Sequence, residues 1–109
     1  PITHCVKGTE GWNLYGELEN SLKNRTCFEK CTFGSDALFD FLRASEYESV
    51  ELIGLVSNIC IISNAIIAKT ALPEAEIIVD ASCTDSFDKE LHNKALDVMQ
   101  GLQITVINK

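Results

Sequence analysis

Two kinds of apolar run alternate along the second half of the chain. Ser49–Val56 is rich in β-forming residues and has the length of a strand buried on both faces, and Glu74–Asp80 and Gln103–Ile107 predict two further strands. Between them, Ile59–Ala71 and Asp85–Leu102 carry apolar residues at helical spacing, and the first of these helices ends before a proline. Alternating strands and helices with short connections predict right-handed crossovers and a mostly parallel sheet flanked by helices. The fold class is therefore α/β.

The first part of the chain has a weaker pattern. Cys5–Gly11 contains two glycines and predicts a turn or loop, whereas Leu14–Leu22 has weak helical spacing. Alternation over Thr26–Cys31 predicts a short strand, and Ser35–Leu42 predicts a helix with its first serine as N-cap. No repeat or linker interrupts the sequence, so residues 1–109 are interpreted as a single domain.

Composition and charge narrow the class of protein. The net charge is −7 and no Lys/Arg cluster is present, which argues against binding to nucleic acid. The longest apolar stretch, Ile59–Leu72, is interrupted by polar residues and is too short for a membrane span. Five cysteines, an odd number, favour reduced thiols and a cytoplasmic protein over a disulfide scaffold. The start at Pro1 has neither Met nor a signal peptide, which predicts that the chain begins in mid-protein.

The parallel sheet predicts where a ligand site should lie. Sites in open α/β folds lie beyond the carboxyl ends of the strands, which points to the loops after Lys30, Val56 and Asp80. Cys60 falls in the first helical turn after the central strand, where free backbone N–H groups favour a thiolate and can hold an oxyanion. The alternative is that Cys60 is a small apolar residue that packs the helix onto the sheet.

Four segments, in order along the chain, resemble the isochorismatase-like cysteine hydrolases. Gly54–Ile61, with the sequence Gly-Leu-Val-Ser-Asn-Ile-Cys-Ile, is similar to the segment that bears the nucleophile of that family, and Phe28–Ser35 to the strand end that bears its catalytic lysine. His4–Gly11 resembles a stretch typical of nicotinamidases, and Asp80–Asp85 resembles the next strand. The resemblance covers essentially the whole chain. It implies the C-terminal portion of a Rossmann-like three-layer fold that lacks its N-terminal strands.

The resemblance implies a role for each matching residue. Cys60 would attack a carboxamide carbon, and Lys30 would lie beside it and steady the negative charge. A cis peptide between Leu55 and Val56 would direct the Val56 N–H, beside the Cys60 N–H, into an oxyanion hole. The implied activity is that of a cysteine amidohydrolase, which converts nicotinamide or a similar aromatic carboxamide to the acid and ammonia through a thioester.

The resemblance also implies a metal ion. His4 matches one ligand of the divalent ion that grips the substrate in nicotinamidases, with zinc, iron and manganese all suited to imidazole, and no organic cofactor is implied. His92 matches no ligand motif and is interpreted as a helix-surface residue. Cys27 and Cys31 could pair as metal ligands, but packing within the fold is the simpler interpretation.

The departures from the family pattern limit these expectations. The aspartate that serves as general base, and the remaining metal ligands of an Asp-x-His stretch, have no counterpart in this sequence. We therefore expect the isolated chain to be inactive, to need the missing N-terminal segment or another chain, and to associate with copies of itself through exposed strand edges. Two alternatives stay open: a related hydrolase of another small amide, such as a carbamoyl or ureido compound, and a truncated or non-catalytic α/β module.

Overall fold

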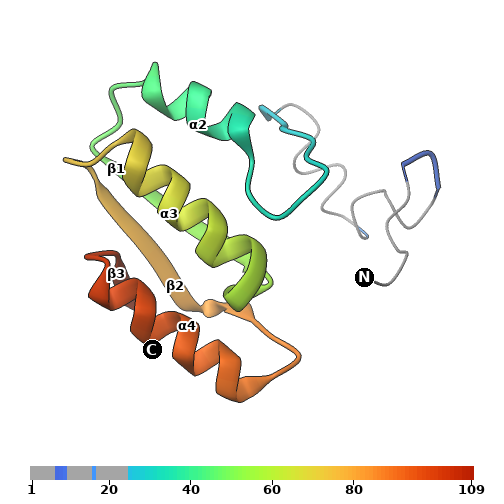
Figure 1. The fold of residues 1–109 in the computed structure, drawn as a ribbon, viewed down its shortest axis with the longest axis vertical. Helices are drawn as coiled ribbons and strands as arrows, with labels where there is room; N and C mark the ends of the chain where they lie inside the picture. Colours follow the sequence, from blue (N-terminus) through green and yellow to red (C-terminus); the bar gives the residue numbers. More distant parts are fainter. Residues whose placement is uncertain (1–6, 10–15, 17–24) are drawn as a thin grey trace.

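The computed structural model of the protein describes residues 7–9, 16 and 25–109. Helices and strands alternate along this part of the chain, as Figure 1 shows. Their bounds are α2 (Asp36–Arg43), β1 (Ser49–Leu55), η2 (Ser57–Ile61), α3 (Ile62–Ala71), β2 (Glu76–Asp85), α4 (Lys89–Gly101) and β3 (Thr105–Ile107). The element η2 is a single π-helical turn that runs directly into α3.

The three strands form a parallel sheet in the order β1-β2-β3. Leu55 at the end of β1 lies opposite Asp85 at the end of β2, so these two strands end side by side. Helices α3 and α4 both pack against β2 and also contact each other, while α2 lies along α3 (Figure 1). The predicted α/β class, a parallel sheet flanked by helices, is confirmed.

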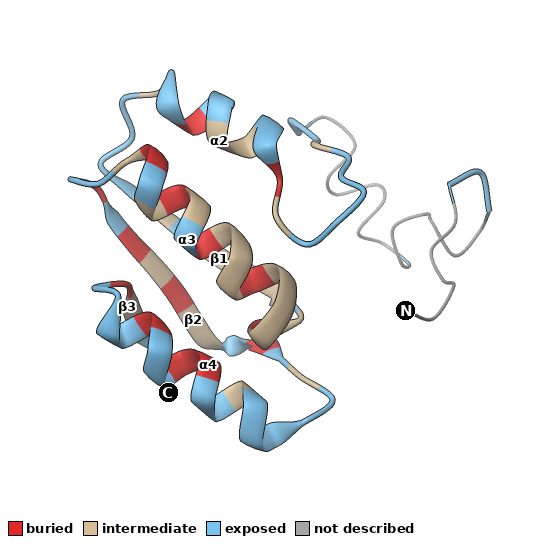
Figure 2. Ribbon diagram, viewed as in Figure 1, coloured by how far each residue is buried: buried red, intermediate tan, exposed pale blue. Residues whose placement is uncertain are grey.

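The core lies between the central strand and the helices α3 and α4. Figure 2 shows the buried positions along β2 and the facing sides of both helices. Fully buried alanines on α3 allow this helix to approach the sheet closely, because a methyl group takes little space. The residues with an exposed fraction of 1% or less are Ala65, Ala68, Ile77, Val79, Leu96 and Met99, with Ser57 as the polar member of the set.

Strand β1 differs from the expectation that both its faces are buried. Val50 and Leu52 pack against the core, but Ile53 and Leu55 on the opposite face are 61% and 67% exposed. Within the described residues β1 is an edge strand, and the helices that cover the sheet lie on its other face. Burial on both faces is therefore not met within the described residues, because a run of apolar residues does not reveal which neighbours cover it.

The predicted helices form, with shifted bounds. Ser35 caps α2 as expected, since its Oγ accepts a hydrogen bond from the Leu38 N–H at 3.1 Å. Asp88 caps α4 by accepting from two backbone N–H groups, so this helix starts later than the predicted Asp85. Helix α3 ends at Ala71, before the proline, as predicted. None of the helices in the described ranges is long and apolar enough to cross a bilayer.

The strand predicted over Thr26–Cys31 is wrong. This segment has no regular secondary structure and pairs with none of the three strands of the sheet. Its alternation has another cause: Phe28 turns inward and packs edge-on against Phe41 of α2, with ring centroids 5.3 Å apart, while its neighbours in sequence are exposed. In this segment the alternation of exposed and inward side chains comes from contact with α2 and not from pairing within the sheet.

Candidate active site

The segment that follows β1 has an unusual backbone. The cis peptide expected between Leu55 and Val56 is present. The predicted helix start is wrong in detail, because Ser57–Ile61 forms the π turn η2 and its N-cap, Val56, makes no side-chain cap. The Ile61 N–H donates to the Val56 carbonyl at 3.0 Å, which closes the wide turn. Single π turns are rare and are frequent at functional sites.

The fold brings Lys30 and Cys60 together. The Lys30 Nζ lies 3.4 Å from the Cys60 Sγ and also donates to the Thr32 carbonyl at 3.0 Å. Cys60 is half-buried in the π turn, whereas Lys30 lies on an exposed loop. An ammonium group at this distance attracts negative charge on the sulfur and on an acyl group bound to it. The two residues singled out from the sequence are thus neighbours, although 30 positions separate them.

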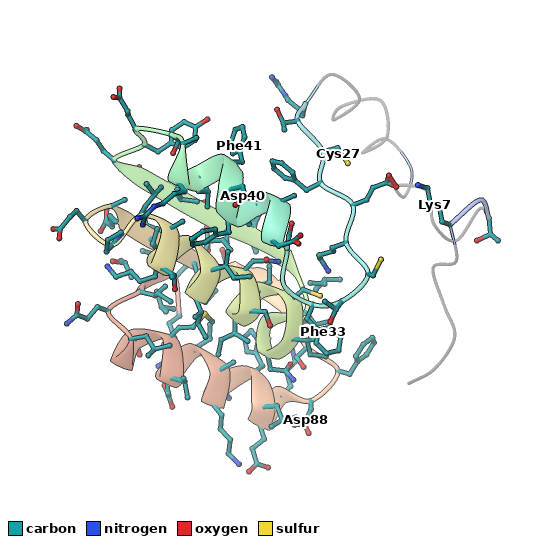
Figure 3. All side chains as sticks on the ribbon, turned by 45° about the horizontal axis from the view of Figure 1, so that its top comes forward. Lys7, Cys27, Phe33, Asp40, Phe41 and Asp88 are labelled. Atoms are coloured by element: carbon teal, nitrogen blue, oxygen red, sulfur yellow. The ribbon has the colours of Figure 1, made fainter. Side chains whose placement is uncertain are left out.

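The loop that carries Lys30 is fixed to α3 by one side chain. Asn64 accepts a hydrogen bond from the Ser35 N–H at 2.9 Å and donates to the Phe33 carbonyl at 3.2 Å. Phe33 itself, labelled in Figure 3, is 57% exposed. Gly34 lies so close to α3 that a Cβ there would be 2.6 Å from the Ile67 Cδ1. The loop therefore depends on contacts with the same helix that follows the cysteine.

A second set of contacts reaches η2 from α4 and from the connection that joins β2 to α4. Strand β2 extends beyond Asp80, so the facing loop begins after Asp85 and not where the sequence placed it. The Ser86 Oγ hydrogen-bonds the Asn58 Oδ1 at 2.5 Å, and the His92 Nδ1 lies 2.7 Å from the Ser57 Oγ. Neither Ser57 nor Asn58 caps the helix with its side chain, since Ser57 bonds to His92 of α4 and Asn58 bonds to Ser86 in the connection before it.

The interpretation of His92 as a surface residue is wrong. His92 is half-buried, and its partner Ser57 has no exposed surface. The sequence did contain a signal for this placement. His92 precedes Ala95, Leu96 and Met99 by three, four and seven positions, which puts it on the buried stripe of α4.

Asp85 is the acidic residue nearest the end of β1 in the sheet register. Its carboxylate hydrogen-bonds Lys89 and accepts from the Ser86 N–H, and these contacts, the lysine first, hold its pKa below the ordinary value for aspartate. A carboxylate that is already paired in this way accepts a proton poorly. Asp85 therefore fits a structural role in the loop better than the role of general base.

Metal ligands and the remaining cysteines give no further site in the described part. His4 lies outside the described residues, and no group of three potential His, Cys, Asp or Glu ligands exists within them. Cys27 and Cys31, which we expected to pack within the fold, are exposed, because the segment that carries them is not a strand. Cys83 is also exposed, and all three are free thiols.

Comparison with known proteins places this arrangement in context. Residues 2–109 match the model of the isochorismatase domain. Among solved structures, nicotinamidase PncA from Bacillus subtilis is 26% identical with a TM-score of 0.83, and the match covers 96% of this chain and 62% of that one. The pyrazinamidase/nicotinamidase of Streptococcus mutans UA159 is 28% identical with a TM-score of 0.80, over 97% and 63% of the two chains.

A third solved structure agrees with the first two. The nicotinamidase SaPncA from Staphylococcus aureus is 25% identical with a TM-score of 0.80, and the match covers 95% of this chain and 70% of that one. No curated protein sequence matches significantly. The chain thus spans about 62% of the length of the Bacillus relative. The predicted isochorismatase-like, Rossmann-like three-layer fold is confirmed by these likenesses.

Proposed function

We propose, since this chain belongs to the isochorismatase family, that it carries the nucleophile half of an amide-hydrolysing active site. The observation that carries the proposal is the 3.4 Å contact between the Lys30 Nζ and the Cys60 Sγ. A thiol in the first turn after a strand, with an ammonium group beside it, suits attack on an acyl carbon. The position of Cys60 in a π turn at the end of β1 adds support.

The proposed reaction has two stages. The Cys60 sulfur gives up its proton and attacks the carboxamide carbon, while the N–H groups of Val56 and Cys60 and the Lys30 ammonium stabilise the charge on the oxygen. The C–N bond then breaks, nitrogen leaves as ammonia with a proton added, and a thioester remains on the sulfur. Water cleaves the thioester to the carboxylic acid and the free thiol.

The proton acceptor in this scheme is a carboxylate from outside residues 1–109. The resemblance implies an aspartate for this role, and Asp85 is already paired with Lys89. We therefore propose that the reaction belongs to the full-length protein, in which another segment or chain completes the site. The exposed face of β1, with Ile53 and Leu55, is a surface that such a segment or a second copy would cover.

The substrate proposed for the full-length protein is nicotinamide or a similar aromatic carboxamide. The support is that the B. subtilis, S. mutans and S. aureus proteins are nicotinamidases and are 25% to 28% identical to this chain. We further propose a divalent ion held in part by His4, and a cytoplasmic protein, in keeping with the free thiols of Cys27, Cys31, Cys60 and Cys83.

Ammonia release from nicotinamide by the full-length protein tests the proposal. Cys60→Ala should abolish release, and mass spectrometry of rapidly quenched wild-type protein should detect an acyl group on the Cys60 peptide. Cys83→Ala is the matched control, because Cys83 is a free thiol at an exposed position and should be dispensable. Release that continues unchanged in Cys60→Ala would refute the proposal. Activity on a carbamoyl or ureido compound alone would keep the cysteine chemistry and reject the substrate.

A further inference from the structure

We infer that His92 is a positioning residue, which holds the π turn of the nucleophile in place through the hydroxyl group of Ser57. The inference rests on the proposed function, because it names a residue that supports the same site. His92 lies on α4 and hydrogen-bonds Ser57, so it acts on the segment that carries Cys60. Its role is therefore distinct from those of Lys30 and of the backbone N–H groups.

The His92 imidazole is the hydrogen-bond partner of a fully buried hydroxyl group. The His92 Nδ1 lies 2.7 Å from the Ser57 Oγ, and the Ser57 side chain has no exposed surface. A buried hydroxyl group without a partner is costly, so the imidazole is required to satisfy it. No other hydrogen bond of this hydroxyl occurs within the described residues. The contact joins elements that are 35 positions apart in the chain.

Ser57 stands at the start of the turn that carries Cys60. Ser57 is the first residue of η2, which includes Cys60 and is separated from β1 by Val56 alone. The next residue, Asn58, is held by Ser86, which lies in the connection just before α4. Two consecutive side chains at the start of the turn are thus fixed from one side, and α3 continues the turn at its other end. Cys60 therefore cannot move far unless one of these contacts breaks.

The buried face of α4 anchors His92. Ala95 and Leu96, which follow it on the same face of α4, are 5% and 1% exposed. This buried stripe fixes the rotation of α4, so the imidazole cannot follow a displaced Ser57. Asp85, just before α4, is paired with Lys89 in the first turn of this helix. Through its hydrogen bond to Ser57, the His92 ring therefore fixes the nucleophile segment relative to α4.

Three variants of the full-length protein test the inference. His92→Ala should lower kcat for nicotinamide about 10- to 100-fold with little change in KM, because a small displacement of the nucleophile impairs attack more than binding. His92→Asn should recover most of the loss, since its carboxamide places a polar atom close to the position of Nδ1. Asn93→Ala, at the adjacent exposed position of α4, should leave kcat unchanged.

A double-mutant cycle separates positioning from general damage to the fold. Ser57→Ala removes the same hydrogen bond from the other side, so Ser57→Ala combined with His92→Ala should lose no more activity than His92→Ala alone. Thermal unfolding is measured for each variant. If His92→Ala proves unfolded, Ser57→Ala with the ring intact becomes the decisive variant, and the same loss of kcat is expected.

A second readout does not depend on amidase activity. The rate of alkylation of Cys60 by iodoacetamide, followed by mass spectrometry of the Cys60 peptide, should fall in His92→Ala and return in His92→Asn. If the wild-type protein releases no ammonia, the proposed function fails and the alkylation rates still test the inference. Unchanged kcat and unchanged alkylation in His92→Ala would overturn it, as would equal effects of His92→Ala and Asn93→Ala or a failure of His92→Asn to recover the loss.

Discussion

Gly34 lies against Ile67 of α3 so closely that a Cβ at position 34 would be 2.6 Å from the Ile67 Cδ1. The hydrogen bonds that Asn64 makes to Phe33 and Ser35 on either side hold the loop in this approach. The loop leads back to Lys30, whose ammonium contacts the Cys60 sulfur. The distance between loop and helix therefore decides whether the lysine reaches the cysteine.

Gly34→Ala should destabilise the full-length protein by about 1 kcal/mol, because the added methyl group forces the Ile67 side chain out of its position. We also expect a loss of amidase activity larger than this change in stability explains, since the loop would shift away from α3. Urea unfolding and kcat/KM measure the two effects. Activity that falls only with the folded fraction would contradict the second expectation.

Two further variants control this prediction. Ile67→Val removes the Cδ1 atom that the new methyl group would meet, so the double variant Gly34→Ala with Ile67→Val should regain part of the lost activity. Gly101→Ala has no atom within 4 Å of the added Cβ and lies in the last turn of α4. It should leave stability unchanged or raise it by up to about 1 kcal/mol.

Lys30→Met should lower kcat/KM by at least about 100-fold, because it removes the positive charge beside the sulfur and keeps most of the side-chain volume. Lys30→Arg should fall between wild type and Lys30→Met, since the charge remains but the planar group fits the site of a compact ammonium poorly. Lys94→Met, on the exposed side of α4 and paired with Glu90, serves as the control. Equal losses in Lys30→Met and Lys94→Met would count against a role for Lys30.

Asp80 makes the stability of the fold depend on pH in the acidic range. Its carboxylate accepts from the Ser82 hydroxyl at 2.6 Å and from Asn108 at 3.1 Å, and these bonds, the serine first, hold its pKa below the ordinary value. Because the pKa is lower in the folded state than in the unfolded state, the ionised carboxylate stabilises the folded protein at pH values above the unfolded pKa. This stabilisation is lost as the pH falls through the folded pKa. The contribution should therefore disappear progressively below about pH 5.

Asp80→Asn tests this dependence. Its urea midpoint should fall less than that of the wild type when the pH is lowered from about 5 to about 3, because the ionised carboxylate is already absent. Asp85→Asn should show the same sign, since Lys89 and the Ser86 N–H hold the pKa of Asp85 below its ordinary value. Parallel acid profiles for the wild type and Asp80→Asn would show that the serine and asparagine bonds contribute nothing to folding.

The sequence predicted the elements that owe their structure to local pattern. The cap at Ser35, the end of α3 before a proline and the alternation of strand and helix depend on neighbours a few positions away, and all three are present. The proximity of Lys30 and Cys60 was also expected, but from the family resemblance and not from spacing.

The failures come from contacts between distant segments. Thr26–Cys31 alternates because Phe28 packs on a helix, and no local signal distinguishes this from pairing within a sheet. Ser57 and Asn58 are residue types that commonly cap a helix, but their side chains hydrogen-bond His92 and Ser86 instead. His92 matches no ligand motif, but its register with Leu96 and Met99 places it on the buried face of α4.

The π turn of η2 separates the direction of Cys60 from the packing of the helix that follows. An α-helix turns about 100° per residue, and a wider turn delays this rotation by the equivalent of an inserted residue. The alanines of α3 can therefore face the sheet while the Cys60 thiol faces a direction that regular α-helical spacing would not give it. Substitutions within the turn need not alter this offset, but deletion of one residue between Ser57 and Ile61 would, and the nucleophile would then face a direction set by the packing of α3.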